Sequence, residues 1–124
     1  VTHIDFTEPY SGALRARILA AAHACGEKIF ERGTYAATQG PRLETAAEIT
    51  RLERDGADVV GMTGMPEAAL ARELGLEYAA IAVCANFAAG RGESTHAVPM
   101  ERIEAVLAEA MGRVRRVIEQ LVAA

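Results

Sequence analysis

The sequence predicts an α/β fold with a mainly parallel or mixed sheet flanked by helices. Helical and strand-like segments alternate along the 124 residues, in the order helix, strand, helix, strand, helix, strand, helix. Such alternation is typical of parallel sheets, because a crossover helix returns the chain to the starting edge of the sheet. The chain is 51% hydrophobic and shows no internal repeat or linker, so residues 1–124 are expected to belong to a single domain.

The helices are predicted from apolar residues spaced three or four apart and from their start and stop signals. Gly26 stops the first helix, and Thr45 with Glu48 three residues later is a capping-box pattern that starts the second. Pro66 suits the first turn of the third, where its missing N–H costs nothing. The fourth is amphipathic and long. The predicted helices cover residues 11–25, 45–56, 66–75 and 99 onward.

Three strands are predicted between these helices. Residues 28–38 contain Ile29, Phe30 and Tyr35, which favour a strand, and residues 57–62 are typical of a short buried strand. The continuous apolar run 78–84 predicts a central parallel strand. Residues 88–98 are rich in Gly, Ser and Ala and are expected to form a mobile loop.

Composition excludes several classes of protein. With 13 basic and 17 acidic residues, the net charge of −4 argues against a general nucleic-acid surface. The chain contains no run of about 18 apolar residues, so no membrane span is expected. No signal pattern is found at its first residues, which favours a cytoplasmic location. Cys25 and Cys84 lack metal-site spacing and are expected to be reduced, buried thiols, while His23 and His96 have no partner at metal or triad spacing.

Polar turns follow each predicted strand, in residues 38–45, in residues 61–67 and at Asn86. In open α/β sheets the ligand crevice lies at these strand ends, so the three turns predict one pocket. Thr63 precedes a helix start and is a candidate anion contact, although it could simply cap the turn. Without further information, Met62 is expected to be a core residue and Asn86 a turn residue. Glu44 is equally compatible with a charge that interacts with the helix dipole and with a ligand contact.

Residues 40–45, 56–63 and 66–67 resemble the C-terminal half of trimeric purine nucleoside phosphorylases and methylthioadenosine phosphorylases. The similarity runs from about His3 to the end of the chain. In that family such a sequence follows an N-terminal half with a Gly-rich phosphate loop and an Arg-His pair. Nothing in this chain matches either, and neither Arg42 nor Arg91 lies in a corresponding motif.

The resemblance implies phosphorolysis of a purine nucleoside, with inorganic phosphate as co-substrate and no metal or organic cofactor. It also implies a homotrimer and a partnership with the N-terminal half of the same enzyme. Without that half, the chain alone is expected to show little or no activity. An alternative of another class is a non-catalytic nucleoside-binding or subunit-interaction fragment.

The resemblance assigns roles to the residues that follow the second and third predicted strands. Met62 would contact the ribose and Thr63 the phosphate. Asn86 would be the catalytic residue, placing a hydrogen-bond donor at the leaving base, where negative charge develops. Family members with Asn here act on 6-oxopurines, and those with Asp on 6-aminopurines. Phe87 and Ala88 would complete this part of the substrate site; Ala88 replaces a second Asp of the adenine enzymes.

Further substrate contacts are implied around the base and the ribose. Glu44 would accept a hydrogen bond from N1–H of a 6-oxopurine, and Leu43 would pack on the purine face. His3 would reach the neighbouring subunit's site, although a surface position is as probable on sequence alone. The last helix has an apolar face whose default assignment is to the core, and the resemblance implies that its residues contact the substrate: Ile103, Val106 and Leu107.

Ile103 stands where nucleoside phosphorylases hold a His for the ribose 5'-hydroxyl. An apolar side chain favours a methylthio group there, so the predicted substrate is S-methyl-5'-thioinosine, cleaved to hypoxanthine and 5-methylthioribose 1-phosphate. The nearer alternatives are inosine or guanosine, and methylthioadenosine.

Overall fold

The computed structural model describes residues 2–123 and confirms the α/β class, with helices and a small parallel sheet. The chain falls into two compact units. Within the described residues, unit 1 comprises residues 2–31, 63–81 and 113–123, and unit 2 comprises residues 32–62 and 82–112. The elements are α1 (Gly12–Ala24), β1 (Tyr35–Ala37), α2 (Ala46–Arg54), β2 (Val59–Gly61), α3 (Glu67–Glu73), the 3₁₀ helix η1 (Gly92–Ser94) and α4 (Met100–Ala123).

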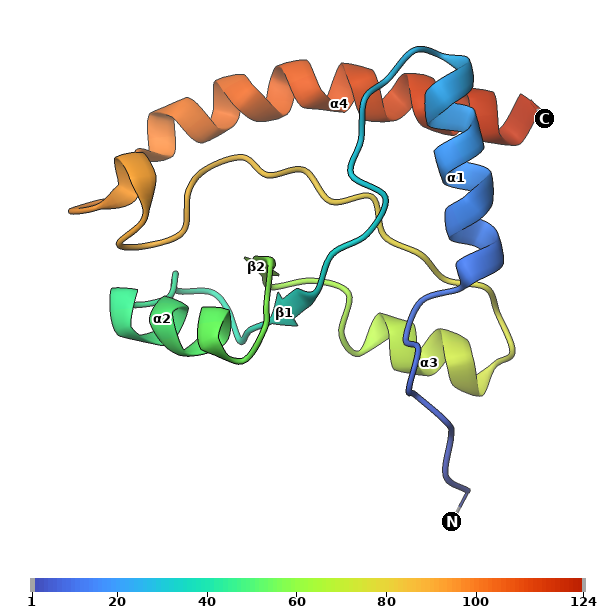
Figure 1. The fold of residues 1–124 in the computed structure, drawn as a ribbon, viewed down its shortest axis with the longest axis horizontal. Helices are drawn as coiled ribbons and strands as arrows, with labels where there is room; N and C mark the ends of the chain where they lie inside the picture. Colours follow the sequence, from blue (N-terminus) through green and yellow to red (C-terminus); the bar gives the residue numbers. More distant parts are fainter. Residues whose placement is uncertain (1, 124) are drawn as a thin grey trace. The chain divides into compact units, whose positions relative to one another are not determined.

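Unit 1 is built on the packing of α1 against the C-terminal part of α4, which cross in Figure 1. Ser11 caps α1, its hydroxyl accepting a hydrogen bond from the N–H of Leu14 at 3.1 Å. Ile18 and Ala22 of α1 pack with Val117 of α4 in a buried apolar cluster. Small Ala residues on α1 let the two helices approach closely, so this cluster holds the unit together.

Glu27, just after α1, joins the same two helices by charge. Its side chain is nearly buried, and its carboxylate accepts hydrogen bonds from Arg113 Nε at 2.6 Å and from Arg116. These two guanidinium groups hold the pKa of Glu27 below its usual value. A nearly buried carboxylate is tolerated here because two cations surround it.

Unit 2 contains the sheet, in which β1 and β2 pair in parallel with Tyr35 opposite Val59. The two strands touch at Gly61, where a Cβ atom would lie 2.2 Å from Tyr35 Oη. Any larger residue would therefore collide with the tyrosine. α2 connects the strands and lies beside them in Figure 1, as expected for a crossover helix.

The helix predictions are confirmed within a few residues, as is a shorter form of the second strand. The strand predicted over residues 28–38 is wrong for residues 28–34. The strand pairing starts only where the Thr34 carbonyl accepts the N–H groups of Asp58 and Val59, at 2.9 and 3.2 Å. No described strand lies beside the preceding residues, and Phe30 is 99% exposed.

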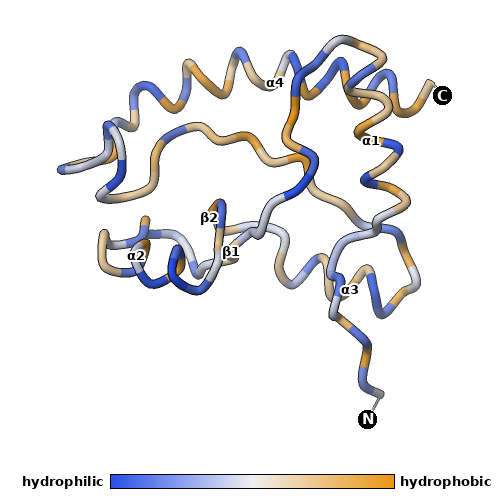
Figure 2. Tube along the Cα trace, viewed as in Figure 1, coloured by the Kyte–Doolittle hydropathy of each residue, from blue (hydrophilic) through white to orange (hydrophobic). Residues whose placement is uncertain are grey.

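The strand predicted over residues 78–84 is also wrong for the described chain. The segment is apolar in Figure 2, but the described sheet contains only β1 and β2. A strand exists only through hydrogen bonds to a neighbour, and among the described residues the backbone bond to this run is from Ser11 N–H to Tyr78 O, at 2.7 Å. Both cysteines are free thiols, but burial was predicted wrongly, since Cys84 is exposed and Cys25 half-buried.

α4 is amphipathic, with alternating apolar and polar residues in Figure 2. One apolar face carries Val117 into the core of unit 1. Other apolar side chains of α4 are exposed: Met100, Val106, Leu107, Met111, Ile118 and Val122. No helix among residues 2–123 is long and apolar enough to cross a membrane.

The substitution Val117→Ala should lower the free energy of unfolding by roughly 1–3 kcal/mol, because it removes two buried methyl groups and leaves a cavity. Val117 is 3% exposed, whereas Val122 on the same helix is 76% exposed. The matched control Val122→Ala should change stability by less than about 0.5 kcal/mol. Urea unfolding followed by circular dichroism measures both, and equal losses would contradict the core described here.

Candidate functional site

The ends of β1 and β2 bring two of the predicted site segments together within unit 2. Thr38, directly after β1, donates its N–H to the carbonyl of Gly61 at 2.9 Å. Met62 follows β2, and a Cβ atom at Gly40 would lie 2.7 Å from Met62 Sδ. Only glycine fits at that position without displacing the methionine. The turn after β1 and the first residue after β2 are therefore direct neighbours, as the sequence predicted.

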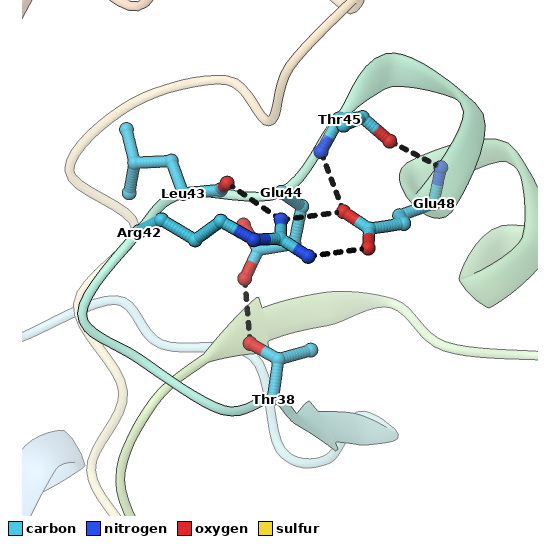
Figure 3. A network of polar contacts seen from close by, with 6 residues as sticks. All are labelled: Thr38, Arg42, Leu43, Glu44, Thr45 and Glu48. Atoms are coloured by element: carbon cyan, nitrogen blue, oxygen red, sulfur yellow. Dashed lines mark hydrogen bonds and ion pairs between the residues drawn. The ribbon is translucent and has the colours of Figure 1, made fainter.

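Glu44 lies in this turn, half-buried and just ahead of α2. Its Oε1 accepts a hydrogen bond from the Thr38 hydroxyl at 2.5 Å (Figure 3). Thr45 is the N-cap of α2 and Glu48 is the acid of its first turn, so Glu44 is outside the helix. The interpretation of Glu44 as a first-turn dipole partner is therefore wrong, and the carboxylate is directed toward the strand ends. Leu43, beside it, has an exposed side chain.

The start of α2 is fixed by the predicted capping box. Thr45 N–H donates to Glu48 Oε2 at 2.7 Å, and Glu48 N–H donates to Thr45 Oγ1 at 3.1 Å. Arg42 binds the same carboxylate through two nitrogens, at 2.8 and 2.9 Å (Figure 3). The Arg42 guanidinium and then the Thr45 N–H lower the pKa of Glu48 to about 2, and Glu48 raises the pKa of Arg42. Arg42 is thus engaged by Glu48 at the start of this helix.

The loop after residue 85 carries the predicted base contacts and lies against α2. Asn86 Nδ2 donates to the carbonyl of Phe87 at 2.7 Å, which orients the amide. The Phe87 ring is 58% exposed and covers Gly92, where a Cβ atom would lie 2.6 Å from the ring. Half-buried Ala88 accepts the N–H of Arg91 at 3.0 Å.

The same loop is anchored to α2 at two points. A Cβ atom at Gly90 would lie 2.7 Å from the Ala46 Cβ, at the first residue of the helix. Arg91 binds Glu53 Oε2 at 2.6 Å and Thr50 Oγ1 at 3.3 Å. The structure therefore places the loop that carries Asn86 along the helix whose start is next to Glu44.

The predicted ribose contacts on α4 also belong to unit 2. Ile103 is half-buried, whereas Val106 and Leu107 are exposed, so their default assignment to the core is wrong for the described chain. Val106 and Leu107 are each more than a third exposed, because the described residues do not cover that face of the helix. An ion pair between Arg102 and Glu93 joins the start of α4 to η1.

Thr63 and His3 belong to unit 1, and both are exposed. Thr63 follows Met62 in the chain, three residues before Pro66, the N-cap of α3. The first turn of α3 carries the acidic residue Glu67. Sequence position thus places Thr63 at the end of β2, while His3 lies in the N-terminal segment.

A cavity of about 270 Å³ lies in unit 1 and contains none of the predicted site residues. Arg72 lines it and donates hydrogen bonds to the carbonyls of Asp5 and Glu8, at 3.0 and 2.5 Å. Its guanidinium therefore fastens the N-terminal segment to α3. The cavity is lined by Pro9, Ser11, Ala68, Arg72, Gly75, Leu76, Glu77 and Tyr78.

Within residues 2–123 the structure holds no group of three His, Cys, Asp or Glu side chains that could bind a metal ion. The residue that sequence reasoning missed is Thr38, which lies in the predicted turn 38–45 but was given no role. A Thr at the end of a strand, six residues before a Glu across a Gly-Pro turn, is the pattern that could have indicated the contact.

Comparison with known proteins identifies the family. The profile of the phosphorylase superfamily matches residues 1–123. A probable S-methyl-5'-thioinosine phosphorylase from Pseudomonas syringae is 59% identical over all of this chain and 50% of its own length. A probable 6-oxopurine nucleoside phosphorylase from Thermococcus kodakarensis is 56% identical over 73% of this chain and 34% of its own.

The fold is shared with solved structures. Methylthioadenosine phosphorylase from Schistosoma mansoni in complex with adenine matches 99% of this chain and 48% of its own, with a TM-score of 0.91 and 27% identity. The chain thus spans about half the length of the relative from Pseudomonas syringae and of the solved structure from Schistosoma mansoni.

The ion pair at the start of α2 predicts a pH dependence. Because folding lowers the pKa of Glu48 from an ordinary 4.5 to about 2, its stabilisation is complete above pH 4.5 and is lost as the pH falls toward 2. Glu48→Gln removes the titrating group, so the stability difference from the unsubstituted protein should shrink across that range. Denaturant unfolding at pH 6, 4 and 2.5 measures it, and a constant difference would contradict the assignment.

A companion variant tests the cause. Arg42→Gln removes the largest contribution to the lowered pKa of Glu48, so the loss of stability in acid should be smaller, and should end at a higher pH, than in the unsubstituted protein.

Proposed function

This chain belongs to the phosphorylase superfamily, and we propose that the protein containing it cleaves S-methyl-5'-thioinosine with inorganic phosphate. The products are hypoxanthine and 5-methylthioribose 1-phosphate. The name of the relative from Pseudomonas syringae, at 59% identity over the whole chain, supports this assignment. Because the chain covers half of that relative, the activity is proposed for the whole protein.

The observation that carries the choice of base is the position of Glu44. Its carboxylate is held at the edge where both strands end, near Met62, with one oxygen bonded to Thr38. An ionised carboxylate only accepts hydrogen bonds. A 6-oxopurine offers a donor at N1–H, whereas adenine offers a lone pair at N1, which a carboxylate repels. Glu44 therefore favours hypoxanthine over adenine as the base.

Asn86 supplies the stabilisation of the leaving base in this proposal. Phosphate attacks C1', the bond from C1' to the purine nitrogen breaks, and its electrons pass into the purine ring. One hydrogen of the Asn86 amide is used by the Phe87 carbonyl, at 2.7 Å. The second hydrogen and the side-chain oxygen are available to the base. A donor of this kind strengthens as charge develops, and so lowers the barrier.

Phosphate itself must be held largely by the rest of the protein. Thr63 offers a hydroxyl group, and we assign it one phosphate contact. Two arginines in the predicted site segments are engaged in ion pairs, Arg42 with Glu48 and Arg91 with Glu53. The cations that a phosphate dianion needs therefore come from outside this chain, in the N-terminal half of the enzyme. We also propose a homotrimer, in which His3 reaches the neighbouring site.

The 5' substituent separates the candidates. Apolar Ile103 cannot hydrogen-bond a 5'-hydroxyl, and it favours a methylthio group. The second candidate is 6-oxopurine nucleoside phosphorylase, which is supported by the name of the relative from Thermococcus kodakarensis. It shares the base recognition by Glu44 and Asn86 and differs only at the ribose.

For the full-length protein, kcat/KM should be highest for S-methyl-5'-thioinosine, lower for inosine and lowest for methylthioadenosine. Asn86→Asp should reduce the preference for the 6-oxopurine by about 100-fold, because the new carboxylate accepts a hydrogen bond from N6–H of a 6-aminopurine and donates none to a 6-oxo group. Asn86→Ala is the control and should lower both rates with a smaller change in preference than Asn86→Asp, because it introduces no carboxylate. A native preference for methylthioadenosine would contradict the assignments of Glu44 and Asn86.

The isolated 124 residues should show phosphorolysis at least about 1000-fold slower than the full-length protein, because phosphate lacks its cations. Release of hypoxanthine, followed by coupled oxidation to uric acid, measures both. Full activity of the isolated chain would overturn the proposed origin of the phosphate site.

A further inference from the structure

We infer that Thr38 is a positioning residue for Glu44, and that it sets the selectivity for purines that carry a hydrogen at N1. The inference rests on the proposed function, because it gives the Glu44 carboxylate its orientation toward the base. Thr38 itself touches the carboxylate and is assigned no contact with the substrate.

The backbone holds Thr38 in place. Its N–H continues the pairing of β1 and β2 by donating to the Gly61 carbonyl at 2.9 Å, directly before Met62. The residue is half-buried at the end of the strand. Its hydroxyl is therefore anchored to the sheet, in contrast to a hydroxyl on a free loop.

The hydroxyl has one hydrogen and two oxygen neighbours. It lies 2.5 Å from Glu44 Oε1 and 3.3 Å from the Gly61 carbonyl. A hydroxyl bond to an ionised carboxylate is typically about 2.5–2.7 Å long and stronger than one to a carbonyl. The hydrogen is therefore directed to Glu44, and the sheet edge holds one carboxylate oxygen (Figure 3).

The charge of Glu44 is left available by this arrangement. The nearby cation, Arg42, uses its two terminal nitrogens on Glu48 and on the carbonyl of Leu43. Among the described residues, the hydrogen-bond partner of the Glu44 carboxylate is the neutral Thr38 hydroxyl, at Oε1. Oε2 can then accept a donor from a ligand. A carboxylate with one oxygen fixed loses less freedom when it binds that donor.

Thr38→Val keeps the shape of the side chain and removes the hydroxyl. In the full-length protein it should lower kcat/KM for S-methyl-5'-thioinosine by about tenfold, the effect of one lost hydrogen bond at the site. The ratio of kcat/KM for S-methyl-5'-thioinosine to that for methylthioadenosine should fall by a similar factor. Thr38→Ser restores the hydroxyl and should recover the ratio. Denaturant unfolding checks that each variant is folded.

The double variant with Glu44→Gln separates the inference from the function on which it rests. If Thr38 acts through Glu44, then Thr38→Val should cause no further loss of selectivity in the Glu44→Gln background. Equal loss in both backgrounds, or no loss from Thr38→Val while Glu44→Gln reduces selectivity, would overturn the positioning role. If Glu44→Gln itself leaves selectivity unchanged, the proposed base recognition fails, and the positioning role fails with it.

Discussion

The parallel pairing of β1 with β2 fixes the part of unit 2 from which the candidate base site is built. With Tyr35 opposite Val59, both strands end at the same edge, and Thr38 adds one more backbone bond to Gly61. The following turn and Met62 then meet, in a space that leaves no room for a Cβ atom at Gly40. Two strands of three residues each can position such a site because Gly40 allows Met62, and Gly61 allows Tyr35, to approach closely.

Charges around this edge are divided between two tasks. Arg42 with Glu48 and Arg91 with Glu53 are pairs that fasten the turn and the 86–98 loop to α2. Exposed pairs of this kind contribute little to stability, but they occupy the hydrogen-bonding nitrogens of both arginines, although Arg42 still interacts electrostatically with Glu44. Among the described residues, the hydrogen-bond partner of the Glu44 carboxylate is a neutral hydroxyl. The local electrostatics thus suit a hydrogen-bond donor on a neutral base better than they suit phosphate.

Sequence reasoning succeeded where a short segment carries its own signal. Thr45 and Glu48 satisfy each other's backbone groups, so the start of α2 was predictable from two residues three apart. It failed where structure depends on a neighbour. An apolar run such as 78–84 cannot reveal whether another strand lies beside it, and the periodicity of α4 shows an apolar face at Val106 and Leu107 but not what covers it. The Thr38 contact to Glu44 spans a turn, and the pattern of the two residues indicates it only once the end of the strand is known.

The extended run from Tyr78 to Ala85 has a consequence for production of this polypeptide. It is apolar along its length, and its backbone groups have few partners among the described residues. An apolar segment whose backbone groups lack partners can pair with another chain, which favours intermolecular β-aggregation. Concealing it is therefore a condition for keeping the chain in solution at high concentration, independent of any catalytic need.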